Sequence, residues 1–252
     1  MLLAIDIGNS NILFGIFEKD KLLHEYKVPT DIVNSYAKCN SVMYDLSHRQ
    51  KVDKIIISSV VPDALTKLNR ILRRIFKCGT YVLGHDIKAP IKNLYHKPKQ
   101  VGQDRLVNGV AVAALYNKSK KTPVVVIDFG TAVTFDLISK ENEYMGGLIF
   151  PGIKLSLESL TRRAALLPKV TLKEPSCIIG RDTKDSMRSG ILHGYASLCD
   201  GVVGRIGAKY GKRLKVVATG GDAPLIARYA SSIDEVDLDL TLKGLKIIAE
   251  SI

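Results

Sequence analysis

One feature constrains this chain most: an apolar strand that runs directly into Asp-x-Gly occurs once in each half. The first copy is AIDIGNSN, residues 4–11, and the second is VIDFGTAVT, residues 126–134. Glycine lets a turn approach a ligand closely, and the backbone N–H groups of such a turn can hold phosphate oxygens. An ordinary hairpin turn is the alternative for either copy alone. The repetition favours two phosphate loops.

The segments around these loops follow the same order in both halves. In the first half we expect three short strands within residues 1–30, a helix over 31–50, a strand ending at Pro62, a helix over 65–77, a strand over 80–84 and a helix over 100–116. The polar stretch KSKKTP, residues 118–123, reads as a linker. After it we expect strands at 122–130, 132–139, 142–152 and 215–221, and helices at 155–166, 184–210, 223–230 and 242–251. This predicts a duplicated α/β architecture, with domains over 1–117 and 122–252 and a cleft between them.

Composition excludes several classes of protein. With 252 residues, 46% of them hydrophobic, the chain can bury one large core or two modest ones. The longest apolar runs, such as 124–127, are far shorter than the roughly 20 residues that span a bilayer, so we expect no membrane segment. The N-terminus has no export-signal pattern, which predicts a cytoplasmic protein. The cysteines and histidines are scattered without ligand spacing, so we expect buried or half-buried free thiols and no dedicated transition-metal site.

The net charge of +12 raises the question of nucleic-acid binding. The densest basic stretch is LTKLNRILRRIFK, residues 65–77. Its apolar side chains recur at helical spacing, and its arginines fall largely off that stripe. A solvated helix face explains this pattern, so we expect no nucleic-acid partner.

A third glycine cluster, KVVATGGDAPLIARY, ends a strand at Thr219-Gly220-Gly221. Asp222 can cap the helix that follows, and Pro224 suits its first turn. The order of phosphate loop, phosphate loop and glycine turn resembles the actin, hexokinase and Hsp70 superfamily of ATP-binding folds. This resemblance implies a duplicated actin-like/ribonuclease H-like ATPase fold. Neither the P-loop nor the Rossmann glycine motif occurs in the sequence.

The segment NLYHKPKQVGQDRLVNG, residues 93–109, adds a candidate base. Asp104 falls in the first turn of a predicted helix, between Gly102 and Arg105. A carboxylate beside a guanidinium can accept a proton while the guanidinium holds an anion. The alternative is a helix cap, Asp104, next to a surface ion pair made by Arg105.

The whole motif set resembles the type III pantothenate kinase family. The matching pieces are D-x-G-N-[ST] at the N-terminus, a tyrosine seven residues before G-x-D-R, D-x-G-T-A, GGLIFPG at 146–152, T-G-G-D-A, and LTLKGL near the C-terminus. They cover essentially the entire chain in order. Gln103 stands where a smaller residue is usual, and Ser10 replaces the commoner threonine.

The resemblance implies transfer of the γ-phosphoryl group of ATP to the primary hydroxyl of pantothenate, the first step of coenzyme A synthesis. It implies Asp104 as the general base and Asp128 as a ligand of a monovalent cation, K⁺ or NH₄⁺, with Mg²⁺ arriving on ATP. The implied pantothenate-binding residues are Tyr95, Gly102, Gln103, Asp104, Arg105 and Thr183. The implied ATP-binding residues are Asp6, Ile7, Gly8, Asn9, Ser10, Asn11, Ile12, Leu13 and Thr131. Thr183 would reach the substrate from a partner subunit, although it also fits a helix N-cap.

A homodimer is therefore expected. The predicted helix at 184–210 carries five glycines, Gly190, Gly194, Gly201, Gly204 and Gly207. Each costs a helix roughly 1 kcal/mol relative to alanine, which suggests that another backbone approaches closely. Packing within the domain is the alternative. Two other functions also fit the sequence: a kinase of the same superfamily acting on a sugar or acetate, and an inactive, DNA-associated regulator.

Overall fold

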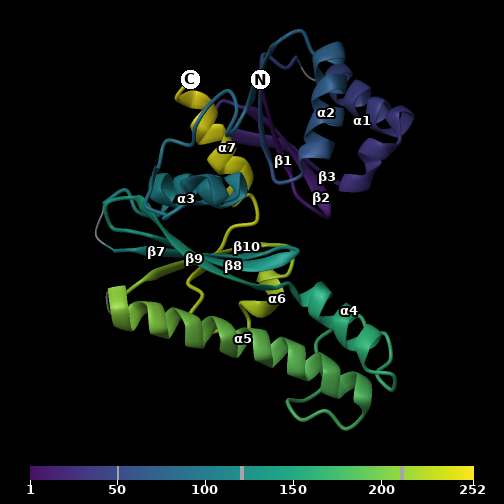
Figure 1. The fold of residues 1–252 in the computed structure, drawn as a ribbon, viewed down its shortest axis with the longest axis vertical. Coiled ribbons are helices and arrows are strands. Elements are labelled where there is room, and N and C mark those ends of the chain that lie inside the picture. The colour runs from purple at the N-terminus through teal and green to yellow at the C-terminus, as the bar shows by residue number, and fades with distance from the viewer. Residues whose placement is uncertain (50, 120–121, 211–212) are drawn as a thin grey trace. The chain divides into compact units, whose positions relative to one another are not determined.

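The structure is a computed structural model that describes residues 1–49, 51–119, 122–210 and 213–252. The chain forms two compact units (Figure 1). The first contains Met1–Ala114 and Asp239–Ile252, and the second contains Leu115–Leu238. Residue 50 of the predicted helix 31–50 and residues 120–121 of the predicted linker lie outside the described residues.

The first unit is built on a sheet with the strand order β3-β2-β1-β4-β5. Its strands are β1 (Leu2–Ile7), β2 (Asn11–Glu18), β3 (Lys21–Pro29), β4 (Lys54–Ser59) and β5 (Gly79–Val82). The first three strands form the predicted antiparallel meander, whereas β4 and β5 run parallel to β1. The carboxyl ends of β1 and β4 therefore lie at one edge, with Asp6 and Ser58 as register partners.

Helices cover both faces of this sheet. The remaining elements of the unit are η1 (Thr30–Asn34), α1 (Tyr36–Arg49), α2 (Pro62–Ile75), β6 (Lys92–Asn93), η2 (Pro98–Gln100), α3 (Gln103–Leu115) and α7 (Leu240–Glu250). On one face, Ile5 and Ile57 pack with apolar residues of α1 and α2. Helix α2 starts at a proline and buries Leu68 and Leu72, while Arg73 stays exposed. The basic stretch is thus an amphipathic helix, as the sequence predicted.

The opposite face is covered by α3 and α7. Ala4 and Ile56 of the sheet pack with Val107 of α3 and Leu245 of α7. The sequence grouped helix 242–251 with the second half, but α7 contacts β1 and β4 of the first unit. Lys54 of β4 helps to hold this helix, because its Nζ donates to the carbonyl oxygens of Ala249 and Ile252, each at 2.9 Å.

The second unit repeats the plan of a meander followed by helices and parallel strands. Within the unit the strands follow the order β11-β10-β7-β8-β9. They are β7 (Val124–Phe129), β8 (Ala132–Ile138), β9 (Glu143–Pro151), β10 (Lys215–Gly220) and β11 (Glu235–Val236). Strands β7, β8 and β9 pair antiparallel, and β10 pairs parallel with β7.

One face of this second sheet buries the unit's main core. The helices of the unit are α4 (Ile153–Arg163), α5 (Thr183–Tyr210) and α6 (Ala223–Ile226). Val125 and Ile127 alternate inward along β7 and pack with Leu192 and Cys199 of α5, which runs along the sheet (Figure 1). Helix α6 is shorter than the predicted helix 223–230, and the Asp222 side chain makes no capping hydrogen bond to it.

Within the described ranges, no helix combines the length and the apolar character needed to cross a membrane. Helix α5, the longest at 28 residues, is interrupted by polar and charged side chains along its length.

The close packing of α7 against α3 gives a first prediction. A Cβ at Gly244 would lie 2.5 Å from the carbonyl oxygen of Val107 and 2.7 Å from its Cγ1. Replacing Gly244 by alanine should therefore lower the free energy of unfolding by about 1–3 kcal/mol, because backbone has to move. Chemical denaturation measures this change.

The matched control is Gly207→Ala in α5, where the nearest atom to the new Cβ is Leu214 Cδ1 at 3.7 Å. This variant should gain up to about 1 kcal/mol from helix propensity. Equal stability of Gly244→Ala and the wild type would show that α7 does not pack as described.

Candidate functional site

The first predicted phosphate loop lies between β1 and β2, and hydrogen bonds from Thr30 hold its backbone in place. The Gly8 N–H donates to the Asn11 carbonyl at 3.0 Å, which closes the turn. Thr30 Oγ1 donates to the Gly8 carbonyl at 2.7 Å, and the Thr30 N–H donates to the Ser10 carbonyl at 3.0 Å. The side chains of Asn9 and Ser10 are exposed. The loop is thus fixed through its backbone while its polar side chains face outward.

The predicted residues on either side of the turn are strand residues. Ile7 and Ile12 pair across the hairpin and are fully buried. Asp6 is half-buried and pairs with Leu13 of β2 and with Ser58 of β4. Asp6 therefore stands at the carboxyl end of β1, beside the end of β4.

Asp104 lies in the first turn of α3, close to the same strand ends. Its Oδ1 accepts a hydrogen bond from the Arg105 N–H at 2.9 Å. A Cβ at Gly102 would clash with Asp104 Oδ1 and would lie 3.4 Å from Val60 Cγ1. Val60 directly follows β4, and its N–H donates to the Ile7 carbonyl at 3.1 Å. The first unit therefore brings both acidic residues to one edge of its sheet.

The alternative in which Arg105 makes a surface ion pair is wrong, because Arg105 is only 8% exposed. A buried guanidinium has to be matched by an anion or by polar groups. Arg105 is therefore a buried polar residue next to Asp104, and not part of the solvent-exposed surface.

The other predicted residues of this segment are also anchored within the first unit. A Cβ at Gly84, which has a φ of +81°, would lie 3.1 Å from Gln103 Cδ and Nε2, so the amide of Gln103 rests on that turn. The Tyr95 N–H donates to Asn93 Oδ1 at 3.0 Å, which turns the chain just after β6. The tyrosine side chain is half-buried.

The second phosphate loop is packed against two other glycine turns. Gly220 ends β10 with a φ of +90°, and a Cβ there would lie 2.5 Å from the Phe129 carbonyl oxygen and 2.8 Å from Asp128 Oδ1. Gly152 ends the GGLIFPG stretch, and its N–H donates to the Thr131 carbonyl at 3.1 Å. Three motifs that are far apart in the sequence thus meet directly. Only glycine fits at these positions because backbone and carboxylate oxygens occupy the space.

A buried polar network that the sequence did not reveal extends along β8. Asp136 is fully buried and accepts hydrogen bonds from Tyr144 Oη at 2.7 Å and from Thr134 Oγ1 at 3.0 Å. Thr134 is the register partner of Asp128 on the neighbouring strand. These hydrogen bonds to the buried Asp136 carboxylate therefore stiffen β8, the strand that follows the second loop.

A pocket of about 670 Å³ lies beside Asp222, just after the third glycine turn. Its apolar wall is made by Ile153, Leu157, Val170 and Leu172. Its charged rim contains Lys154, Glu158, Arg162 and Lys169. An apolar wall with a polar rim is typical of a small-molecule site.

Tyr195 of α5 holds the two segments that lead into this pocket. Its hydroxyl donates to the Pro151 carbonyl at 2.7 Å and shares a 2.7 Å hydrogen bond with Ser156 Oγ. Burial raises the pKa of the Tyr195 hydroxyl, so it stays protonated and able to donate.

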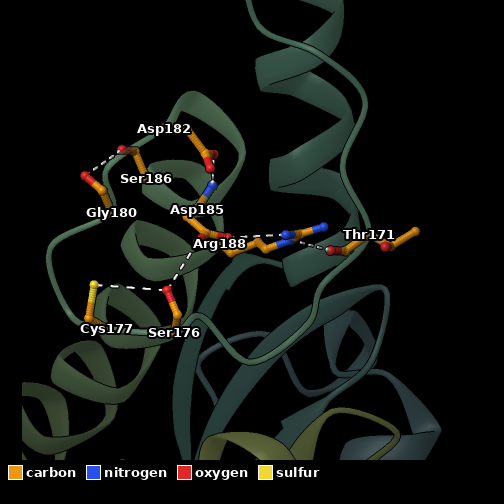
Figure 2. A network of polar contacts seen from close by, with 8 residues as sticks. All are labelled: Thr171, Ser176, Cys177, Gly180, Asp182, Asp185, Ser186 and Arg188. Carbon is orange, nitrogen blue, oxygen red and sulfur yellow. Dashed lines mark hydrogen bonds and ion pairs between the residues drawn. The ribbon is translucent and has the colours of Figure 1, made fainter.

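Thr183 begins α5 but is not its cap. Figure 2 shows the polar network at this end of the helix, where Asp182 Oδ1 accepts the Asp185 N–H at 2.9 Å. The N-cap is therefore Asp182, one residue before the position that the sequence suggested. The Thr183 side chain is exposed.

The loop before α5 is tied down by further bonds of the same network. Arg188 bonds to Asp185 Oδ1 at 3.1 Å and to the Thr171 carbonyl at 3.4 Å, and Ser186 Oγ donates to the Gly180 carbonyl at 3.3 Å (Figure 2). Ile178 and Ile179 in this loop are nevertheless 66% and 73% exposed. The loop presents apolar side chains from an ordered backbone.

Four of the five helix glycines line an exposed face of α5. A Cβ added at Gly190, Gly194, Gly201 or Gly204 would meet nothing within 4 Å. At 100° per residue these four positions fall on one side of the helix, and Gly207 falls on another. The close backbone approach that the glycines suggest does not occur within the described residues of the chain.

The cysteines are free thiols, as expected, but the expected burial is wrong for Cys177, which lies exposed in the loop before α5. Burial raises the pKa of the Cys199 thiol to about 12, so this group is unreactive. Among the residues that the structure describes, no three or more His, Cys, Asp or Glu side chains gather in a way that could hold a metal ion.

Comparison with known proteins gives a consistent result. A sequence profile of the type III pantothenate kinase family matches residues 2–205. A type III pantothenate kinase of Syntrophus aciditrophicus is 42% identical over 253 residues, covering 98% of each chain. The one of Halalkalibacterium halodurans is 40% identical over 253 residues, covering 98% of each chain.

Solved structures share the fold at low sequence identity. A ROK family glucokinase from Streptomyces griseus, in complex with glucose and AMPPNP, has a TM-score of 0.57 at 12% identity, covering 99% of each chain. The activator of the 2-hydroxyisocaproyl-CoA dehydratase from Clostridium difficile, with bound ADPNP, has a TM-score of 0.56 at 12% identity, covering 99% of this chain and 96% of that one. The predicted duplicated actin-like ATPase fold is confirmed.

The capping geometry of α5 gives a second prediction. Asp182→Ala should lower the free energy of unfolding by about 1 kcal/mol, because the Asp185 N–H loses its acceptor. Thr183→Ala, one residue later, should leave stability unchanged within about 0.5 kcal/mol. Denaturant titration of both variants measures the difference. If Thr183→Ala lost more stability than Asp182→Ala, Thr183 would be the cap.

Proposed function

The chain belongs to the type III pantothenate kinase family, and from that premise we propose which of its residues carry out the phosphorylation of pantothenate by ATP. The reaction is the first step of coenzyme A biosynthesis. Phosphoryl transfer needs positioning, charge neutralisation and a group that takes the proton of the attacking hydroxyl. The family membership favours pantothenate over a sugar or acetate as the acceptor.

Asp104 is the general base of the proposal. Its carboxylate is half-buried at the start of α3 and is fixed by the Arg105 N–H and by the packing at Gly102. Negative charge is favoured at the N-terminus of a helix, and a carboxylate at this place can accept the hydroxyl proton of pantothenate. This placement is the single observation on which the proposed mechanism rests.

Pantothenate is held by the residues around this base. The buried guanidinium of Arg105 pairs with the substrate carboxylate, for which its fork of donors is well suited. Gly102 and Gln103 line the site, and the half-buried ring of Tyr95 packs against the substrate. Gln103 is larger than the residue that is usual at this position. Its side-chain amide packs against Gly84, which keeps the side chain away from the substrate.

The nucleotide is held by both glycine loops. Residues Asp6–Leu13 and Thr131 bind the phosphates, with Asn9 and Ser10 supplying exposed donors on a loop that Thr30 holds rigid. The nucleoside occupies the pocket beside Asp222, whose apolar wall suits a flat base and whose rim suits a ribose. A divalent metal accompanies the phosphates of ATP.

A monovalent cation at Asp128 fits the residues present. The Phe129 carbonyl oxygen and Asp128 Oδ1 both lie against Gly220, and a hard cation takes oxygen ligands of this kind. K⁺ or NH₄⁺ there would offset part of the phosphate charge. The carboxylate is kept in place by the contact with Gly220 and by the stiff strand behind it.

We further propose that the enzyme is a homodimer whose partner contributes Thr183. The exposed glycine face of α5 allows another backbone to approach closely, and the ordered loop before it exposes Ile178 and Ile179. Thr183 adjoins that loop and is not engaged in capping, so its hydroxyl is available. We also propose a cytoplasmic location, where free thiols stay reduced.

The role of Asp104 is tested by Asp104→Asn. We expect kcat for pantothenate phosphorylation to fall by about 10²–10⁴-fold, because amide nitrogen and oxygen cannot take the hydroxyl proton. The circular dichroism spectrum and the affinity for ATP should stay close to those of the wild type.

A control for the loss of one negative charge is Asp45→Asn, an exposed position on α1. It should keep full activity. If Asp104→Asn phosphorylated pantothenate at the wild-type rate, Asp104 would not be the base.

The dimer is tested by Gly194→Leu, which places a bulky side chain on the glycine face of α5. We expect the dissociation constant of the dimer to rise by about tenfold or more, with activity falling at low protein concentration. Light scattering and concentration-dependent assays measure both. Gly207→Ala, off this face, should stay dimeric, and a monomeric, fully active wild type would rule the dimer out.

A further inference from the structure

Ser58 carries a buried hydroxyl group whose hydrogen-bonding capacity is unused. The residue is 0% exposed, and its Oγ has no hydrogen-bond partner among the described residues. A hydroxyl can donate one hydrogen bond and accept two. A buried polar group that makes none carries the full cost of its desolvation, so such groups are rare and point to a missing water or ligand atom.

The hydroxyl lies on the same face of the sheet as the Asp6 carboxylate. Asp6 and Ser58 are register partners in the parallel pair of β1 and β4, and neighbouring strands are about 4.8 Å apart. Side chains alternate along both strands, since Ile5 and Ile57 enter one core whereas Ala4 and Ile56 enter the other. Asp6 and Ser58 therefore continue the second face, at the carboxyl ends of the strands.

The neighbouring serine shows that the unused hydroxyl is a particular feature of position 58. Ser59 Oγ accepts the Val61 N–H at 3.1 Å and donates to the Val61 carbonyl at 3.2 Å. That hydroxyl shapes the turn from β4 into α2. Ser58 has no such backbone role, so its hydroxyl contributes nothing visible to the fold.

No direct hydrogen bond joins Ser58 to Asp6, and because Ser58 is 0% exposed, a bridging water would have to enter together with the metal. Two oxygens on adjacent strands can both lie within hydrogen-bond distance of a water between them. The proposed nucleotide site begins at Asp6, and Mg²⁺ keeps several water ligands when it binds through one or two carboxylates and phosphates.

We propose that Ser58 is a positioning residue for the divalent metal of the nucleotide: its hydroxyl and the Asp6 carboxylate hold the same water, which belongs to the hydration shell of that metal. This inference rests on the proposed function and deepens it. Ser58 orients the water through one hydrogen bond, while the charge that attracts the metal comes from Asp6.

The proposal and a structural role make opposite predictions for Ser58→Ala. Removing a hydroxyl that bonds to nothing in the protein should leave the melting temperature of the ligand-free enzyme unchanged or higher. The affinity for ADP in the presence of Mg²⁺ should nevertheless fall by about 10–100-fold, as is typical when an outer-shell partner of a metal is lost. The affinity for ADP in EDTA should not change.

The matched control is Ser59→Ala, which removes a hydroxyl that bonds to the Val61 backbone. It should lower the melting temperature and leave the Mg²⁺ dependence of ADP binding as in the wild type. Isothermal titration of ADP with and without Mg²⁺, run on the wild type, both serine variants, Asp6→Asn and the double variant, gives the complete comparison. The two changes at Asp6 and Ser58 should be strongly non-additive, because they remove one shared water.

Two outcomes would overturn the proposal, and they differ from each other. If Ser58→Ala binds Mg²⁺ and ADP like the wild type, or if it only loses stability, Ser58 has no role at the metal, whereas the kinase function stands. If the wild type binds ADP equally well with and without Mg²⁺ and does not phosphorylate pantothenate, the proposed function fails and the inference fails with it.

Discussion

Close packing against glycine positions is the constraint on which the rest of the structure depends. At Gly102 the carboxylate of Asp104 fills the space that a side chain would take, and at Gly220 the carboxylate of Asp128 and a backbone carbonyl do the same. At Gly152 the space belongs to the backbone of the second loop. These contacts hold the acidic groups against the backbone. A catalytic carboxylate that is held in this way loses little entropy when the substrate binds.

The two units support their loops by different means. In the first unit, Thr30 holds the loop through two backbone carbonyl groups. In the second, the Asp136 network stiffens the strand that follows the loop. The proposed reaction needs both loops, since one begins beside the base and the other carries the proposed cation ligand.

Much of this arrangement could be predicted from the sequence, because the strand ends, glycine turns and helix starts are local patterns. The strands before Asp6 and Asp128 and the helix that carries Asp104 are where the patterns placed them. The supporting residues Thr30 and Asp136 could not be predicted, because they act through partners elsewhere in the fold, the Gly8 carbonyl and the Tyr144 hydroxyl. The helix after Gly221 is shorter than its pattern indicates, and α7 packs on the first unit, since tertiary packing overrides local periodicity. The roles of the individual site residues stay predictions.

The most direct test of the central claim is a crystal structure of the enzyme with pantothenate, Mg²⁺ and a non-hydrolysable ATP analogue. The account predicts the Asp104 carboxylate within hydrogen-bond reach of the pantothenate primary hydroxyl, at about 2.6–3.2 Å, with the side chains of Asp6 and Asp128 directed at the terminal phosphates and their cations. A complex in which Asp104 points away from that hydroxyl while another group accepts its proton would contradict the account.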